Sequence, residues 1–380
     1  MDLPEEYGIV SCQKDAPVQI QSNRPGSGKI FPACYAGLNL TQTTILLMHN
    51  SLPQHTLVDS FHRHINYLRI SITDRCNLRC CYCAPGWPIE KMPHESILRY
   101  EEILRVVRVG VSLGIVKARV TGGEPFVRKG CCDFLEELTR IPGLSDISVT
   151  TNGVMLKRHL PRLREMGIRR LNISLDTLQP EKYKQITGVH AFSRVWDSIE
   201  TALEMGFSPV KINAVALNGI NDDELTELAR LTYAYPVHVR FIEQMPFGET
   251  SFSDHAPLLA PEIHNRLQRV APLEPVNRQK NDGPARRYRF AGALGEIGLI
   301  TAVSRHFCRE CNRLRLTADG RLRACLLSNQ TTDIKTALRN KGSDKTLAGI
   351  FLEAAASKPE QHNLQTRQAN GLNRMNTIGG

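Results

Sequence analysis

The 380-residue sequence predicts an α/β protein with a partial barrel of six strand–helix units and a smaller C-terminal domain. Helix-like stretches separate strand-like segments near 67–73, 116–121, 146–151, 169–176, 210–217 and 237–243. Such alternation favours a parallel sheet with right-handed crossovers. After about residue 245 the pattern changes to short helices and hairpins. We therefore expect a barrel over 57–245 and a C-terminal domain over 246–380.

The helix-like stretches are identified by their spacing of apolar residues. Residues 98–113 are an example, because Ile103, Leu104, Val107 and Val111 fall on one face of a helix. We expect this face to pack against the sheet.

Each predicted strand alternates polar and apolar side chains with period two. The apolar face should meet the helices. The polar face must line an interior, because both faces of a parallel sheet are covered. A closed eight-stranded barrel fills its centre with branched apolar side chains, so a polar, cationic interior indicates a wider cavity for a charged ligand. The alternative is that its Lys and Arg pair with internal acids such as Asp176. The polar face comprises Arg69, Ser71, Thr73, Lys117, Arg119, Thr121, Ser148, Thr150, Asn172, Ser174, Asp176, Lys211, Asn213, His238 and Arg240.

The composition is that of an ordinary soluble protein, with 41% hydrophobic residues and a net charge of +10. The basic excess suits an anionic ligand, although no dense Lys/Arg run of the nucleic-acid type stands out. The early apolar run 45–48 is too short for a membrane span or a signal-peptide core. We expect a cytoplasmic protein without a nucleic-acid or membrane partner. Residues 1–56 lack periodicity and read as a disordered extension or a start-site artefact, with Met48 as an alternative initiator.

The sequence has 11 cysteines, and four of them lie between 76 and 83. Disulfides are rare in a reducing compartment, so clustered cysteines there indicate metal binding or catalysis. Cys76, Cys80 and Cys83 form C-x3-C-x2-C directly after the first predicted strand, at the sheet edge where α/β barrels do chemistry. Three thiolates in one loop can hold a 4Fe–4S cluster and leave its fourth iron open for a ligand. Cys81 breaks this spacing and is expected to be a bystander.

A second trio of cysteines surrounds a predicted hairpin. Strand-like segments 313–317 and 321–323 flank an Asp-Gly turn, which is a hairpin signal. Two cysteines precede the hairpin and one follows it, so all three can converge. This trio is Cys308, Cys311 and Cys325.

Arg313 and Arg315 are two residues apart on a strand and therefore share a face near the second trio. Guanidinium groups beside an anionic cluster suit an anionic, phosphate-like ligand. We favour a second functional 4Fe–4S cluster. The alternatives are a zinc site with His306 as fourth ligand, a purely structural cluster, and a solvated cationic strand face.

The first trio, together with Tyr82, resembles the signature of the radical S-adenosylmethionine (SAM) superfamily. The segment 121–125 (TGGEP) resembles the SAM-binding segment of that superfamily. In those enzymes the open iron binds the amino and carboxylate groups of SAM, and an electron from the cluster releases a 5′-deoxyadenosyl radical. The resemblance implies a radical SAM form of the partial (βα)6 barrel, with the C-terminal domain carrying the second iron–sulfur cluster.

From about Leu57 to the end, the chain also resembles the GTP 3′,8-cyclases of molybdenum-cofactor biosynthesis. The motifs that carry this resemblance lie at 57–61, 68–76, 119–125, 150–153, 172–176, 218–222, 240–243, 308–325 and 379–380. The first 56 residues lie outside it.

This resemblance implies the site residues. SAM would contact Tyr82, Gly123, Ser174 and Met245. GTP would contact Arg69, Lys117, Arg119, Thr150, Lys211, Arg240, Arg313 and Arg315. The last two are also expected to be catalytic, by steering the final electron and proton. In this family the C-terminal tail reaches the active site, so Gly379 and Gly380 are expected to be catalytic too.

The implied enzyme is a lyase whose cofactors are two 4Fe–4S clusters and SAM. It would remove the 3′ hydrogen of the GTP ribose and join that carbon to C8 of guanine, giving 3′,8-cyclo-7,8-dihydroguanosine triphosphate. Expected partners are a low-potential electron donor such as flavodoxin or ferredoxin, and cyclic pyranopterin monophosphate synthase as the next enzyme. A homodimer is left open.

Two other functions remain open from the sequence. One is a radical SAM enzyme that modifies a peptide or RNA. The other is a zinc-stabilised nucleic-acid-binding protein, which would be colourless rather than brown and would bind DNA or RNA in a salt-sensitive way.

Overall fold

Six parallel strands form the centre of the fold in a computed structural model, which describes residues 56–83, 91–245, 256–277, 283–362 and 375. Each strand pairs in parallel with the next along the chain, as predicted. The strands are β1 (Tyr67–Ser71), β2 (Lys117–Thr121), β3 (Asp146–Thr151), β4 (Arg170–Ser174), β5 (Val210–Ala216) and β6 (Val237–Glu243). Most of the expected N-terminal extension lies outside the described residues.

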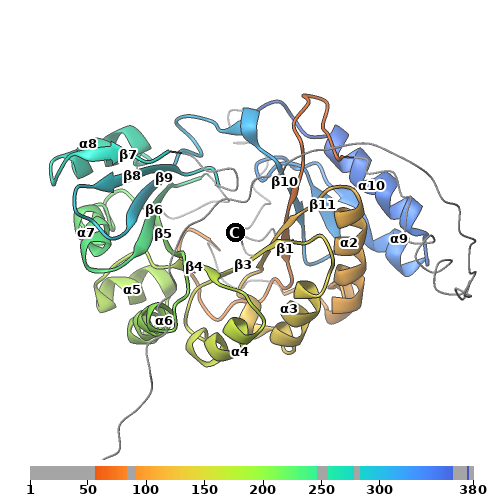
Figure 1. Ribbon diagram of the computed structural model, residues 1–380, viewed down its shortest axis with the longest axis horizontal. Helices are drawn as coiled ribbons and strands as arrows, with labels where there is room; N and C mark the ends of the chain where they lie inside the picture. Colours follow the sequence, from red (N-terminus) through yellow and green to blue (C-terminus); the bar gives the residue numbers. More distant parts are fainter. Residues whose placement is uncertain (1–55, 84–90, 246–255, 278–282, 363–374, 376–380) are drawn as a thin grey trace, which may run out of the picture. The chain divides into compact units, whose positions relative to one another are not determined.

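Helices connect these strands and lie on the outer side of the curved sheet (Figure 1). They are α2 (Tyr100–Ser112), α3 (Cys131–Thr139), α4 (Leu160–Glu165), α5 (Pro180–Thr187), α6 (Phe192–Glu204) and α7 (Leu225–Ala234). The apolar strand faces meet them in the main hydrophobic core, where Leu68, Ile70 and Val120 are fully buried. Burying apolar surface on this outer side leaves the polar strand faces on the inner side, as the alternation predicts.

Helix α2 shows one difference from its predicted pattern. Three of the four residues expected on its buried face are buried: Ile103, Leu104 and Val107. Val111 is only half-buried, while Val106, Val109 and Gly110, which continue the buried face on the side of Ile103, are buried. The reason is that a C-terminal helix packs there: a Cβ on Gly110 would lie 3.3 Å from the ring of Phe351. The buried face of α2 is therefore wider than predicted and extends beyond Ile103.

The segment after residue 245 adds strands to both edges of the same sheet. The sheet order is β12-β11-β10-β1-β2-β3-β4-β5-β6-β9-β8-β7. Strand β10 is parallel to β1, and β9 is parallel to β6, whereas the outer pairs are antiparallel. These strands are β7 (Leu273–Pro275), β8 (Arg286–Phe290), β9 (Glu296–Ile300), β10 (Arg313–Leu316), β11 (Arg321–Arg323) and β12 (Thr332–Asp333). The expected limit at 245 stays a prediction, but no break in the sheet marks it.

The predicted hairpin forms as β10 and β11, with Gly320 in the turn at φ +78°. The remaining helices are α8 (Ala260–Gln268), α9 (Lys335–Arg339) and α10 (Asp344–Ala356). Short 3-10 helices are η1 (His94–Ser96), η2 (Pro125–Val127), η3 (Lys157–His159) and η4 (Cys308–Glu310).

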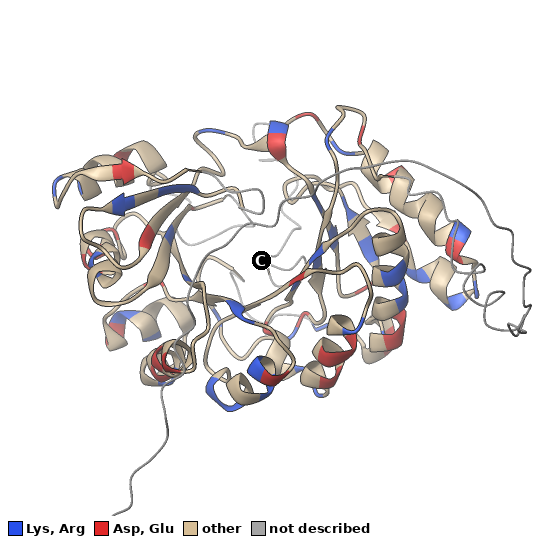
Figure 2. Ribbon diagram, in the orientation of Figure 1, with Lys and Arg blue, Asp and Glu red and all other residues tan. Residues whose placement is uncertain are grey.

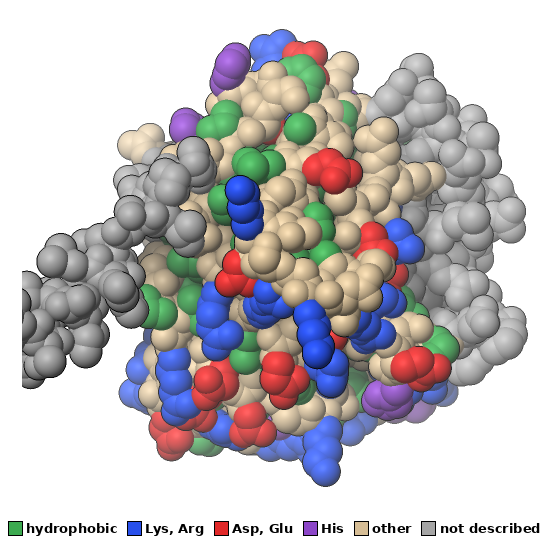
Figure 3. Space-filling view, turned by 90° about the vertical axis from the view of Figure 1, so that its right-hand side faces the viewer, with side chains coloured by type: hydrophobic (Ala, Val, Ile, Leu, Met, Phe, Trp, Pro, Cys, Tyr) green, Lys and Arg blue, Asp and Glu red, His purple; other side chains and the backbone are tan. Residues whose placement is uncertain are grey.

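Charge is distributed differently over the strands and the outer helices. In Figure 2, acidic residues gather on outer helices such as α2, α3 and α6, while several strands carry Lys or Arg. On the face seen in Figure 3, basic side chains are interspersed with acidic ones. Arg105 pairs with Asp344 at 2.7 Å and Arg339 with Glu102 at 3.3 Å, so these basic residues of α2 and α9 have acidic partners on α10 and α2.

Among the residues searched for a membrane span, no helix has the length and hydropathy that a span requires.

Candidate active site

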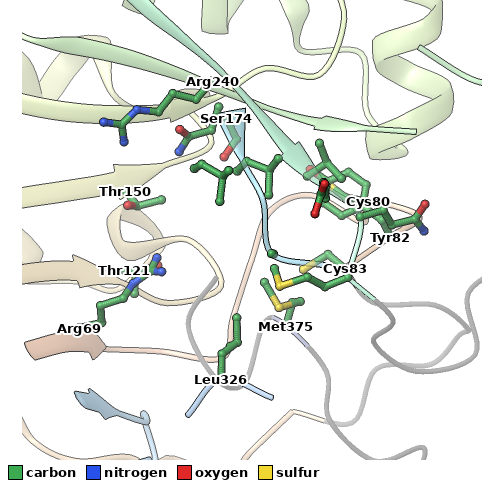
Figure 4. A pocket seen from close by; sticks show the side chains of 18 of the residues that line it. Arg69, Cys80, Tyr82, Cys83, Thr121, Thr150, Ser174, Arg240, Leu326 and Met375 are labelled. Carbon is green, nitrogen blue, oxygen red and sulfur yellow. The ribbon is translucent and has the colours of Figure 1, made fainter. Parts of the chain in front are cut away.

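A cavity of about 310 Å³ lies on the inner side of the sheet. This volume is within the range of small-molecule sites. Strand residues of the predicted polar face line it, including Arg69, Arg119, Thr150, Ser174 and Arg240. Figure 4 shows four of these side chains along the strands, with Cys80, Tyr82 and Cys83 across from them. The polar strand faces therefore do line an interior.

The two cysteine trios line this one cavity from opposite ends of the strands. Cys76, Cys80 and Cys83 follow the carboxyl end of β1. The second trio lies at the other end, because β10 runs parallel to β1 with Arg313 beside Tyr67, and Cys308 and Cys311 precede β10. Cys325 follows β11, whose end lies beside the beginning of β10. Strand-borne cations occupy the space between the two ends.

Backbone contacts fix the first cysteine loop. Gly123 N–H donates to the Thr73 carbonyl at 2.7 Å, and Glu124 N–H donates to the Arg75 carbonyl at 2.8 Å. A Cβ on Gly123 would lie only 2.5 Å from the Arg75 carbonyl oxygen. Glycine is therefore required here, because the TGGEP segment lies directly against the backbone that leads into Cys76.

The Glu124 carboxylate is a structural anchor for this end of the barrel. It is fully buried and accepts hydrogen bonds from Thr151 Oγ1 (2.7 Å), Asn152 N–H (2.7 Å) and Phe126 N–H (3.2 Å). Burial raises its pKa to about 7, against the lowering effect of these hydrogen bonds. Glu124 thus ties the loop after β2 to the loop after β3.

The first cysteine trio is suited to an iron–sulfur cluster. Burial raises the pKa of the Cys76 and Cys80 thiols, and iron would displace their protons on coordination. Leu78 N–H and Asn152 Nδ2 donate to Cys76 Sγ at 3.4 and 3.7 Å. Such N–H···S contacts favour an anionic sulfur. Cys81 does not line the cavity, and its N–H bonds to the Ile186 carbonyl.

The four residues expected to contact SAM all line the cavity: Tyr82, Gly123, Ser174 and Met245. The Tyr82 hydroxyl donates to Asp176 Oδ2 at 2.7 Å, and Asp176 Oδ1 accepts the Val215 N–H at 2.8 Å. Met245 packs against Leu327 together with Met375. The expected SAM contacts therefore lie in the same cavity as the first trio.

Six of the eight residues expected to contact GTP line the cavity: Arg69, Arg119, Thr150, Arg240, Arg313 and Arg315. Desolvation, together with the neighbouring guanidinium groups of Arg119 and Arg313, lowers the pKa of Arg69 to about 9. The hydroxyl oxygen of Thr150 is buried and has no hydrogen-bond partner in the described part of the chain. The same is true of Asn213 Oδ1, which also lines the cavity. A polar anionic ligand would satisfy these atoms and offset the crowded positive charge.

Lys117 and Lys211 are buried on the same strand faces but do not line the cavity. Lys117 pairs with Asp146 at 3.1 Å, and its Nζ lies 5.1 Å from the centre of the Tyr67 ring. Desolvation lowers the pKa of Lys211 to about 6, and Arg240 is the next largest cause. The expected pairing of interior cations with acids thus occurs at Lys117, through Asp146.

The second trio lies next to two cations. Burial raises the pKa of Cys311, but the charges of Arg313 and Lys358 outweigh it and lower that pKa to about 6. Cys308 has a raised pKa, again because of burial. Arg315 is buried, and desolvation lowers its pKa. An anionic cluster would compensate this positive charge.

The zinc alternative at the second trio stays a prediction, because the described residues show no preformed metal-holding group at either trio. Within the described residues, no three His, Cys, Asp or Glu side chains are close enough to hold a single metal ion. The expected fourth ligand, His306, is exposed and contacts the ring of His362 edge-on at 4.0 Å between ring centres.

Sequence reasoning missed several cavity residues. His362 and Tyr183 line the cavity, and Lys358 lies behind the second trio. None of them belongs to a local pattern, so only the folded chain reveals them. The two expected catalytic residues at the chain end, Gly379 and Gly380, lie outside the described residues.

Comparisons with known proteins agree with this site. A family model described as the radical SAM superfamily matches residues 70–232, and one described as Molybdenum Cofactor Synthesis C matches residues 237–364. The chain is 48% identical, over 85% of its length and 99% of the relative's, to a GTP 3′,8-cyclase of Moorella thermoacetica. It is 45% identical, over 81% of its length and 95% of the relative's, to a GTP 3′,8-cyclase of Heliobacterium modesticaldum.

The fold is similar to that of a solved protein, SuiB of Streptococcus suis. The crystal structure of Streptococcus suis SuiB bound to S-adenosylmethionine matches with a TM-score of 0.52 and 16% identity, covering 76% of this chain and 68% of that one. SuiB bound to the precursor peptide SuiA matches with a TM-score of 0.55 and 15% identity, covering 82% of this chain and 70% of that one. At this identity the likeness concerns the fold alone.

Proposed function

This chain belongs to the GTP 3′,8-cyclase family of radical SAM enzymes, and we propose that it is a lyase that converts GTP to 3′,8-cyclo-7,8-dihydroguanosine triphosphate in molybdenum-cofactor biosynthesis. The observation that carries the proposal is one cavity with a cysteine trio at each end and strand-borne cations between them. An anionic nucleotide held between two metal clusters fits this arrangement.

The first trio would hold a 4Fe–4S cluster through Cys76, Cys80 and Cys83. Such a cluster, with SAM on its open iron, supplies the 5′-deoxyadenosyl radical. The chain would position SAM with residues that line the same cavity as the trio: Tyr82, Gly123, Ser174 and Met245. The Tyr82–Asp176 hydrogen bond and the glycine contact at Arg75 fix two of these residues before SAM binds.

GTP would occupy the cationic middle of the cavity. Arg69, Arg119 and Arg240 supply guanidinium groups for the phosphates, and Thr150 supplies a buried hydroxyl. Lys117 and Lys211 would contribute charge from the same strand faces. Much of the catalysis would be placement, because the reacting atoms must approach within about 3–3.5 Å.

The second trio, Cys308, Cys311 and Cys325, would hold a second 4Fe–4S cluster against which guanine lies. Arg313 and Arg315 would be catalytic there, by directing the final electron and proton. The chain end would complete the site through Gly379 and Gly380, as in the family.

Other parts of the expected context are proposals of the same kind. The radical reaction needs electrons at low potential, which flavodoxin or ferredoxin would provide. The cyclised nucleotide would pass to cyclic pyranopterin monophosphate synthase. We place the enzyme in the cytoplasm and leave a homodimer open.

The test is anaerobic reconstitution of the full chain with iron and sulfide, followed by incubation with GTP, SAM and dithionite. We expect 5′-deoxyadenosine and the cyclised nucleotide to form together, and only with GTP. A variant with all three cysteines of the first trio changed to Ala should form neither product.

Equal SAM cleavage with ATP, CTP and GTP, without a cyclised product, would contradict the substrate assignment. GTP-independent cleavage that a peptide or RNA stimulates would instead favour the alternative radical SAM function.

A further inference from the structure

A buried lysine outside the expected site forms hydrogen bonds with two of the chain segments that carry the second cysteine trio. Lys358 follows α10 and is 3% exposed. Its Nζ donates to the Arg313 carbonyl at 2.9 Å and to the Ala324 carbonyl at 2.6 Å. The Cys311 side chain is close enough to interact with this ammonium and to raise its pKa. An ammonium has three hydrogens, so the two carbonyl contacts leave one donor for the cysteine side.

The two carbonyls belong to the chain segments that carry the cysteines. Arg313 is two residues after Cys311, and Ala324 directly precedes Cys325. The two segments belong to adjacent antiparallel strands, and the last residue pair of their ladder towards this end is Arg315 with Arg323. Lys358 therefore bridges the two strands of the hairpin just beyond their last residue pair, next to Cys311 and Cys325.

The third cysteine is tied to the same stretch of chain by Arg63. Its Nη1 donates to the Cys308 carbonyl at 2.6 Å and to the Glu360 carbonyl at 3.0 Å, and its Nη2 donates to the Pro359 carbonyl at 2.7 Å. Residues 358–360 thus connect to all three cysteine segments, and Lys358 makes two of the three connections.

The hydrogen bonds to carbonyls do not neutralise the positive charge of the buried Lys358 ammonium. Among the described residues no carboxylate forms an ion pair with it, whereas Lys182 on the barrel pairs with Asp223 and Glu224 at 2.7 Å. A buried ammonium without a counter-ion is costly. A cluster held by three thiolates is anionic and would supply the missing negative charge.

We propose that Lys358 is a positioning residue for the second iron–sulfur cluster, which holds the segments of Cys311 and Cys325 together and raises the reduction potential of the cluster. The inference rests on the second cluster of the proposed function. A nearby positive charge stabilises the more negative, reduced cluster, so the sign of the shift follows from electrostatics.

The test uses the full chain with the first trio changed to Ala, so that iron, sulfide and the electron paramagnetic resonance signal report the second cluster alone. In this background we compare Lys358→Met, Lys358→Gln and Lys358→Arg with the surface control Lys345→Met on α10. Lys358→Met should reduce cluster content. Lys358→Gln keeps donors without charge, so it should shift the midpoint potential to more negative values. Lys358→Arg should keep the potential near that of the control.

The outcomes separate the two proposals. If the background protein itself binds no iron at the second trio, the second cluster of the proposed function is wrong. If it binds a cluster and both Lys358→Met and Lys358→Gln match Lys345→Met in content and potential, the role of Lys358 is wrong. If Lys358→Met does not fold, the potential of Lys358→Gln decides, and an unshifted potential overturns the inference.

Discussion

Two buried residues in the barrel have pKa values far from their ordinary values. Lys211 is the clearest case, because desolvation and the nearby Arg240 and Arg170 charges lower its pKa to about 6. Asp176 shows the opposite effect of burial, which raises its pKa to about 6 even though it accepts hydrogen bonds from Tyr82 and Val215. Burial in the barrel interior therefore disfavours the charged forms of Lys211 and Asp176, and the neighbouring cations add to this effect at Lys211.

GTP binding should be coupled to protonation of Lys211. At pH 7.5 this lysine is mostly neutral in the empty barrel, since its pKa is about 6. A bound triphosphate favours the ammonium form and raises that pKa, so the protein should take up close to one proton on binding. GTP affinity should then fall as the pH rises above 6. Each unit of pKa increase corresponds to about 1.4 kcal/mol, or about tenfold in Kd.

Titration calorimetry at pH 7.5 in phosphate and in Tris measures this proton uptake, since the two buffers differ in ionisation enthalpy. Lys211→Met should abolish the uptake and weaken binding about tenfold or more. Lys211→Arg stays charged, so it should bind without the uptake. Equal uptake by Lys211→Met and the unchanged chain would assign the proton to another group.

At the scale of elements, buried carboxylates fasten the loops at the carboxyl ends of the strands. Glu124 joins the loops after β2 and β3. Glu224 accepts from Thr177 Oγ1 and Leu178 N–H, which joins the loops after β4 and β5. Glu243 accepts from Ala260 N–H and Val303 N–H, which joins the end of β6 to α8 and to the turn after β9. Hydrogen bonds to these buried carboxylates therefore fix the loops that carry the expected ligand contacts, in place of packed apolar side chains.

The contact between the TGGEP loop after β2 and the backbone before Cys76 can be tested with a single substitution. Gly123→Ala places a methyl group against the Arg75 backbone, so the loop must move and strain the hydrogen bond from Gly123 to Thr73. Overpacking of this kind costs about 1–3 kcal/mol. We expect loss of iron from the first trio with the barrel still folded. The measurement is iron content in a background where the second trio is changed to Ala, together with the thermal unfolding midpoint.

Gly349→Ala on α10 is the matched control. A Cβ at that position meets nothing within 4 Å, and alanine in a helix interior should add up to about 1 kcal/mol of stability. Full iron content in Gly123→Ala would show that the loop adapts to the extra methyl group.

The elements themselves could largely be predicted from local patterns. The strand predicted at 237–243 is observed as Val237–Glu243, and the helix predicted at 98–113 is observed as Tyr100–Ser112. Period-two and helical spacing carry this information because burial acts on each face separately. The cysteine spacing and the polar strand faces indicated the cavity for the same reason. Individual contacts to SAM and GTP stay predictions.

What local patterns could not predict was the pairing of distant elements. Nothing in β10 specifies β1 as its neighbour, since the residues of β1 and β10 are far apart in sequence and parallel pairing leaves no turn signal. That pairing brings the second trio to the cavity. Lys358 and Arg63 were missed for the same reason, because their partners are carbonyl groups of remote segments.

At the scale of the whole molecule, the sheet makes the barrel and the C-terminal segment dependent on each other. Strand β10 covers one edge of β1, and β9 covers the edge of β6. Leu314 and Leu316 of β10 and Ile297 of β9 are fully buried in the same core as the barrel strands. Removing the segment after residue 245 would expose this apolar surface and two unpaired strand edges.

The described part of the chain should therefore unfold in a single cooperative transition. A protein with two independent domains at the limit of 245 would instead show two transitions, or a stable fragment. Urea unfolding of the cluster-free chain, followed by far-ultraviolet circular dichroism and by Trp196 fluorescence in a Trp87→Phe variant, should give coincident curves. A fragment that ends at residue 245 should aggregate or stay unfolded. Separate midpoints for the two probes, or a soluble folded fragment, would show that the continuous sheet does not couple the two segments.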